Sequence, residues 1–126
     1  IKARLDDAKA TGKLDELTRE TSASVHGCNA ADARDVAALF EALDAAGKTP
    51  DVVVYNASSR VRGALVDLAP EDVKRAIEVS AFGAFLVSQQ AVKRMLPKGH
   101  GAVLLSGATA GVKGFALSAT FAMGKF

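Results

Sequence analysis

The chain has 126 residues, which is enough for at most one domain, since domains usually hold about 100 to 200 residues. It is 49% hydrophobic and 24% charged, with a formal net charge of +2. These values exclude a disordered tail, a collagen-like repeat and a strongly basic nucleic-acid binder. The single cysteine, Cys28, excludes an internal disulfide, and no apolar stretch has the length of a membrane span or the form of a signal peptide. We therefore expect a globular, cytoplasmic protein.

The first third of the chain predicts a helix, a strand and a second helix. Leucines at helical spacing predict a helix over 1–20 with a break at Gly12, and β-branched residues favour a strand over 21–28. Asp32 is a typical N-cap for the next helix, and Gly47 is a typical residue to end it. The apolar stripe of that helix consists of Val36, Leu39, Phe40 and Leu43.

Strands are predicted over 52–56 and 102–106, because each range begins with a continuous apolar run of strand length. Runs that are apolar on both faces belong inside a parallel sheet, so we expect both strands to be covered on both sides. Between them, Pro70 marks the first position of a long helix over 71–96, which a proline and two glycines then end. A further helix is expected to begin near Ser118, with that serine as its N-cap.

The alternation of strands and helices predicts a Rossmann-like α/β fold, in which a doubly wound parallel sheet carries helices on its faces. No G-x-G-x-x-G turn follows a first strand. We therefore interpret 1–126 as an interior part of a single domain, with both ends truncated.

Ligands of open parallel sheets bind beyond the carboxyl ends of the strands, so the polar residues that follow the predicted strands are candidate ligands. These are Asn29, the turn Asn56-Ala57-Ser58, and Ser106 to Thr109. Asn and Ser also follow strands simply as turn formers, and the two interpretations carry equal weight at any one position. His26 and His100 have no second ligand at suitable spacing, so we expect no metal site.

The order of these motifs resembles the short-chain dehydrogenase/reductase family of nicotinamide-dependent oxidoreductases over nearly the whole chain. Residues 51–58 (DVVVYNAS) resemble the fourth strand and N-N-A-G turn of the family, and 79–85 (VSAFGAF) resemble its V-N-x-x-G-x-F helix segment. Residues 102–126 resemble the catalytic strand and the start of the Y-x-x-x-K helix. In the turn, Asn56 and Ala57 match, whereas Tyr55 and Ser58 depart from the pattern.

The resemblance implies a depleted active site. The helix asparagine of the family falls on Ser80, its serine on Ala108 and its tyrosine on Phe121, and only its lysine is kept, as Lys125. Phenylalanine has no proton to give, and loss of the serine removes a hydrogen bond of a kind worth about 3 kcal/mol in the transition state. Neighbouring hydroxyls could substitute only weakly, because an unactivated hydroxyl is a poor acid at neutral pH.

The resemblance further implies an NAD(P)-dependent oxidoreductase that acts on an alcohol or carbonyl, so that 1–126 is part of an NAD(P)-binding domain. The alternative is a non-catalytic dinucleotide-binding or scaffold protein with the same fold. We expect Lys125 to be the catalytic residue, and NAD or NADP to be the cofactor. The expected cofactor site consists of Asn29, Asn56, Ala57, Ser58, Ser106 and Lys125. The expected partner is a small-molecule substrate, with no nucleic acid and no membrane.

The long helix has a thin polar face between Ser80 and Val92. A helix that is apolar nearly all round must be covered on both sides, and the sheet covers only one. We therefore expect a second subunit on the other side, and members of the resembled family form dimers and tetramers through this region. The sequence thus predicts a homodimer or homotetramer.

Overall fold

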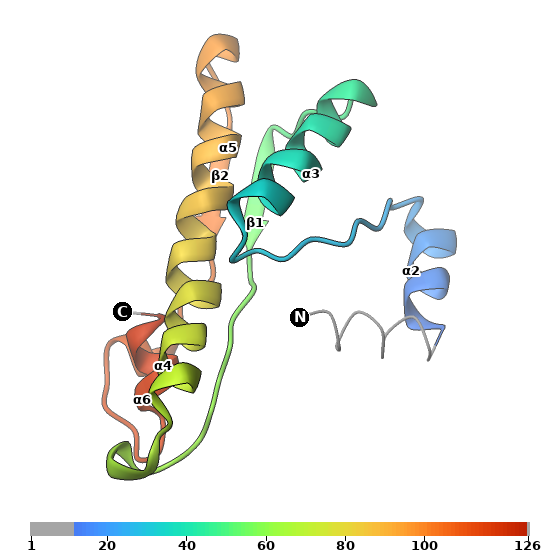
Figure 1. Ribbon diagram of the computed structural model, residues 1–126. Helices are drawn as coiled ribbons and strands as arrows, with labels where there is room; N and C mark the ends of the chain where they lie inside the picture. The colour runs from blue at the N-terminus through green and yellow to red at the C-terminus, as the bar shows by residue number, and fades with distance from the viewer. Residues whose placement is uncertain (1–11, 126) are drawn as a thin grey trace.

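The computed structural model describes residues 12–125 and contains a short parallel sheet with helices packed on one side of it (Figure 1). The sheet consists of β1 (Val52–Tyr55) and β2 (Ala102–Leu105), which pair in parallel with Val53 opposite Val103. Both predicted apolar runs are therefore strands, and their parallel pairing across a helical connection confirms the predicted α/β fold class.

The helices alternate with these strands along the chain. They are α2 (Lys13–Thr21), α3 (Ala33–Ala45), α4 (Pro70–Ile77), a π-helical turn (Glu78–Phe82), α5 (Gly83–Lys98) and α6 (Ala119–Met123), with short 3-10 turns at Leu65–Asp67 and Thr109–Gly111. Within the described part of the chain, no helix combines the length and the apolar character that crossing a membrane requires.

The ends of α3 lie where the sequence predicts them. The Asp32 side chain accepts a hydrogen bond from the backbone N–H of Arg34 (2.8 Å) and so caps the first turn. At the other end Gly47 takes a left-handed conformation (φ +66°), and the N–H of Lys48 donates to the carbonyl of Leu43 (2.8 Å). This pattern satisfies carbonyl groups that the helix would otherwise leave open.

The predicted long helix is present over α4 and α5, with Pro70 at its first position. Two details differ from the prediction. A π-helical turn interrupts the helix at Glu78–Phe82, and the helix ends at Lys98, with Pro97 inside its last turn. A proline there removes only one helical hydrogen bond, so the helix can continue by one more residue before Gly99 (φ +73°) ends it.

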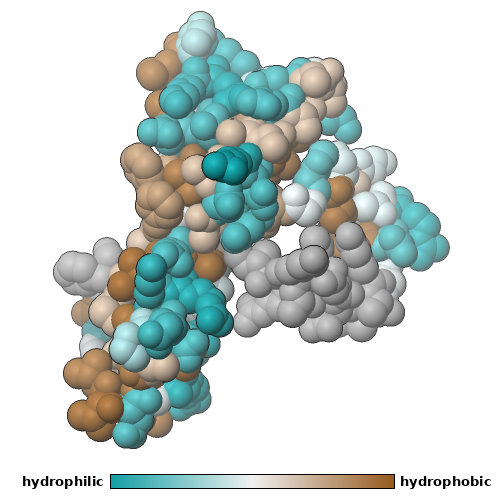
Figure 2. Space-filling model, viewed as in Figure 1, coloured by the Kyte–Doolittle hydropathy of each residue, from teal (hydrophilic) through white to brown (hydrophobic). Residues whose placement is uncertain are grey.

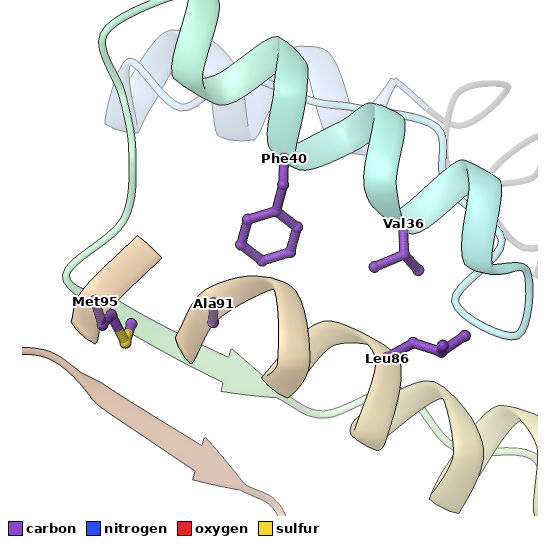
Figure 3. Packing of buried hydrophobic residues seen from close by; sticks show 5 residues of the cluster. All are labelled: Val36, Phe40, Leu86, Ala91 and Met95. Carbon is purple, nitrogen blue, oxygen red and sulfur yellow. The ribbon is translucent and has the colours of Figure 1, made fainter. Parts of the chain in front are cut away.

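The core lies between α3, α5 and the inner face of the sheet (Figure 3). Its buried members are Val36, Phe40, Leu86, Ala91 and Met95. At the edge of this core the guanidinium of Arg94 stacks on the Phe40 ring (5.1 Å to the centroid), and its Nε donates to Asp44 Oδ2 (2.6 Å). These contacts connect α5 to α3 across the apolar interface.

In the described structure the strands are covered on one face, and a cover on the other face is absent. Val52 and Val54 are 60% and 63% exposed, and Leu104 is 51% exposed. Side chains of a strand alternate between the two faces of a sheet, and α3 and α5 both pack on the face that carries Val53 and Val103. No element among residues 12–125 covers the opposite face.

The strand expected over 21–28 is also absent. Residues 22–29 run as a largely exposed connection from α2 to α3 (Figure 1), because no described strand lies beside them to take up their backbone hydrogen bonds. The helix predicted over 1–20 is found from Lys13 onward, directly after Gly12 (φ +69°). Its first part, residues 1–11, lies outside the described residues.

Candidate functional site

The carboxyl ends of β1 and β2 point to the same end of the molecule, and α6 lies there (Figure 1). The Lys125 Nζ donates a hydrogen bond to the carbonyl oxygen of Ser106 (2.7 Å), and the N–H of Ser106 donates to the carbonyl of Tyr55 (3.0 Å). Ser106 therefore connects the candidate lysine to the end of β1. From there the chain continues into the turn Asn56-Ala57-Ser58, in which Asn56 is exposed and the other two residues are half-buried.

Asn29 belongs to a different local arrangement. Its side-chain oxygen accepts from the N–H of Ala31 (3.2 Å), and its own N–H donates to Asp35 Oδ2 (3.0 Å). Both bonds stabilise the turn that enters α3, and neither reaches Ser106 or Lys125. Whether Asn29 contacts a cofactor thus stays a prediction.

Tyr55 has a role that the sequence analysis missed. Its buried hydroxyl donates to the carbonyl of Val79 in the π-helical turn, and burial, together with nearby Cys28, raises the pKa of the phenol. Gly83 makes room for this contact, because a Cβ at that position would lie 2.8 Å from the carbonyl oxygen of Ala30 and closer still to the Tyr55 hydroxyl. The backbone of Gly83 is ordinary helix, so close approach is what requires glycine here.

Ser80, at the position of the family asparagine, is buried (4% exposed) at the junction of three segments. Its Oγ accepts a hydrogen bond from the N–H of Ser59 in the loop after β1 (3.2 Å). On another side Gly124, just after α6, packs so closely that a Cβ there would lie 2.5 Å from the Ser80 Cβ. Ser80 therefore fixes the loop and α6 against the π-helical turn.

Thr120 joins the same loop to α6 through two hydrogen bonds. It is fully buried, and its Oγ1 donates to the carbonyl of Val61 (2.7 Å) and accepts from the N–H of Val61 (3.2 Å). Ser118 occupies the predicted N-cap position of α6, but its hydroxyl donates to the carbonyl of Ala116 (3.4 Å) and makes no capping bond. The prediction of the position is thus confirmed, and the capping role is wrong.

Phe121, at the position of the family tyrosine, is half-buried under a charged group. The guanidinium carbon of Arg60 lies 5.2 Å from the centroid of its ring, and Nη2 of Arg60 donates to Ser118 Oγ (3.4 Å). Sequence analysis did not single out Arg60, because the arginine and the ring it covers are 61 residues apart in the chain.

A pocket of about 450 Å³ lies between α5 and the end of β2. Its lining includes Ser80, Ser88, Ser106 and Lys125, and the Ser88 hydroxyl is buried without a hydrogen-bond partner in the described structure.

Cys28 is half-buried against the core. Burial, and then the charges of Asp35 and Asp32, raise the pKa of its thiol, which therefore stays protonated at neutral pH.

Comparison with known proteins relates this geometry to a family. The family model described as enoyl-(acyl carrier protein) reductase matches residues 2–126. No curated protein sequence matches the chain.

Several solved structures resemble the chain. A short-chain dehydrogenase from Streptomyces avermitilis aligns with a TM-score of 0.82 at 21% identity, over 89% of this chain and 43% of that one. The gluconate 5-dehydrogenase of Burkholderia cenocepacia, in complex with NADP and tartrate, aligns with a TM-score of 0.73 at 25% identity, over 76% and 38%. A 4-hydroxyisoleucine dehydrogenase complexed with NADH aligns with a TM-score of 0.76 at 20% identity, over 81% and 45%. The chain therefore spans less than half the length of these structures, and it shares their fold.

Proposed function

Because this chain belongs to the short-chain dehydrogenase/reductase family, we propose that it binds NAD or NADP and acts as an oxidoreductase on an alcohol or carbonyl substrate. When bound, the nicotinamide cofactor accepts or supplies the hydride. Two structural relatives, solved with NADP and with NADH, support this choice of cofactor.

The observation that carries the proposal is the position of Lys125. Its ammonium is held at the carboxyl end of β2 by one hydrogen bond to Ser106, and an ammonium has three N–H donors. Two donors thus stay available for a ribose hydroxyl. Lys125 therefore serves in this proposal as the cofactor ligand and as the remaining catalytic residue of the family set.

Small residues at the carboxyl ends of both strands support a dinucleotide site. The turn after β1 uses small residues, Ala57 and Ser58, next to the exposed amide of Asn56. After β2, a Cβ at Gly107 would meet nothing within 4 Å, so the backbone there is open to close approach. Backbone and small side chains at the carboxyl ends of parallel strands are where such folds place a nucleotide.

A non-catalytic role is the second candidate, and Phe121 and Ala108 are the observations that favour it. These residues replace the hydroxyls that would hold the substrate oxygen and move its proton. A protein with Lys125 but without those hydroxyls would bind the dinucleotide and turn over slowly or not at all.

The experiment that tests the proposal is titration of the full-length protein with the oxidised and reduced forms of both cofactors, followed by a screen for hydride transfer. We expect Lys125→Met to weaken cofactor binding by about 1.5 to 3 kcal/mol, the value of a hydrogen bond to a charged group. Lys113→Met, in the loop before α6, is the control and should change the affinity little. Unchanged affinity in Lys125→Met would remove Lys125 from the site, and tight binding without turnover would favour the non-catalytic role.

We also propose that α5 mediates assembly into a homodimer or homotetramer. Four large side chains of this helix and the turn before it are exposed along one side, and two of them, Phe82 and Phe85, stack at 6.2 Å. The exposed fractions are 46% for Phe82, 55% for Phe85, 41% for Val92 and 73% for Leu96. Figure 2 shows hydrophobic surface along this edge of the molecule. Sedimentation of the full-length protein as a monomer at micromolar concentration would contradict the assembly.

A further inference from the structure

We propose that the substrate carries a carboxylate near its reacting alcohol or carbonyl, and that the guanidinium of Arg60 binds this carboxylate. The inference rests on the proposed oxidoreductase function and names the class of its substrate, a hydroxy acid or oxo acid. Its starting point is the place of Arg60, which lies over the face of Phe121 (5.2 Å to the centroid), at the position where the family has its reactive phenol.

Arg60 is held in this place by buried groups on both sides. The backbone N–H groups of the residues before and after it donate to the hydroxyls of Ser80 (3.2 Å) and Thr120 (3.2 Å). Its own Nη2 donates to Ser118 (3.4 Å). All three hydroxyl residues are at most 4% exposed. The loop therefore presents the guanidinium in a fixed position, which lowers the entropic cost of binding a ligand.

The charge of Arg60 is not neutralised within the described structure. Among residues 12–125, no carboxylate oxygen lies within 4.0 Å of its guanidinium nitrogens, whereas Asp72 and Glu78 further along the chain pair with Arg75 and Lys74. A guanidinium has five N–H donors, and Ser118 is the one side-chain acceptor that Arg60 contacts in this part of the chain. Arg60 is exposed, so its remaining donors are open to a ligand.

The chemistry of the guanidinium selects the ligand class. Its planar fork matches a carboxylate with two parallel hydrogen bonds, and such charge-assisted bonds are about twice as strong as neutral ones. The site has lost the neutral hydroxyl donors of the family at Phe121 and Ala108, so a neutral substrate would find few partners there. A carboxylate on Arg60 would instead orient the substrate against the half-buried Phe121 ring.

The test uses calorimetric titration of the full-length protein, with and without saturating cofactor. The probes are lactate, malate and mandelate, each compared with its own methyl ester, which keeps the hydroxyl and removes the charge. We expect at least one acid to bind at least about tenfold more tightly than its ester. Arg60→Met should weaken binding of that acid at least about tenfold, and Arg60→Lys should fall between, because lysine keeps the charge without the fork.

Arg62→Met is the matched control, since Arg62 is an exposed arginine of the same loop and makes no hydrogen bond or ion pair in the described structure. The Arg62→Met protein should bind the acids with the same affinity as the unchanged protein. The inference is overturned if the esters bind as tightly as the acids, if Arg60→Met binds the acids normally, or if no acid binds. The cofactor affinity measured in the same samples separates the two proposals. Cofactor binding without acid selectivity contradicts this inference alone, and absence of cofactor binding contradicts the proposed function.

Discussion

Replacement of Gly83 by alanine should destabilise the fold, although alanine is the better helix former. In a helix interior the change gains about 1 kcal/mol of intrinsic propensity. Here the new methyl group would meet the Ala30 carbonyl oxygen at 2.8 Å and, closer still, the Tyr55 hydroxyl. Overpacking of this kind costs about 1 to 3 kcal/mol, and displacement of Tyr55 from Val79 removes a hydrogen bond worth about 1 kcal/mol. The backbone carbonyl cannot rotate away, so we expect a net loss of about 2 kcal/mol.

Urea unfolding measures this loss as a lower midpoint with an unchanged m-value. Tyr55→Phe removes the hydroxyl that the new methyl group would meet first, so Gly83→Ala should cost less in that background. The double-mutant cycle should therefore show a coupling energy of about 1 kcal/mol. Gly107→Ala is the control, because nothing lies within 4 Å of its new Cβ, and it should change stability by less than about 0.5 kcal/mol. A Gly83→Ala protein as stable as the original, or an equal cost in both backgrounds, would refute the reasoning.

Three further predictions concern the site and its support. Phe121→Tyr restores a phenol four residues before the lysine and should raise hydride-transfer activity about 100-fold, as general acid catalysis typically does; unchanged turnover would show that the proton donor is not the limiting loss. Thr120→Val removes both hydrogen bonds to Val61 and should cost about 2 kcal/mol in urea unfolding, whereas a loss below about 0.5 kcal/mol would show that the loop is held by other contacts. Hydrogen bonds from Thr49 and Arg94 hold the pKa of Asp44 below its usual value. The stability that Asp44 contributes is therefore complete above the unfolded-chain pKa of about 3.9 and is lost as the pH falls through the lower folded-state pKa. The midpoint temperature of thermal unfolding should consequently fall less steeply between about pH 6 and about pH 3 for Asp44→Asn than for the original protein. An equally steep fall in both proteins would contradict the assignment.

The sequence by itself determined those elements whose signals are local. The N-cap Asp32 and the glycine Gly47 act on backbone groups within a few residues of themselves, so the bounds of α3 could be predicted. The apolar runs before Asn56 and Ser106 are strands for the same reason, since length and apolar composition are properties of a short segment.

The tertiary structure alone decided which distant groups meet. A strand exists only where a neighbour takes up its hydrogen bonds, so residues 22–29 are irregular although a strand was expected there. The contacts of Tyr55 with the π-helical turn and of Arg60 with α6 join residues 24 and 61 positions apart. Burial, close approach and cation–π contact depend on distances through space between such segments. No periodicity or cap within one segment encodes those distances, because they are set when the helices pack against the sheet.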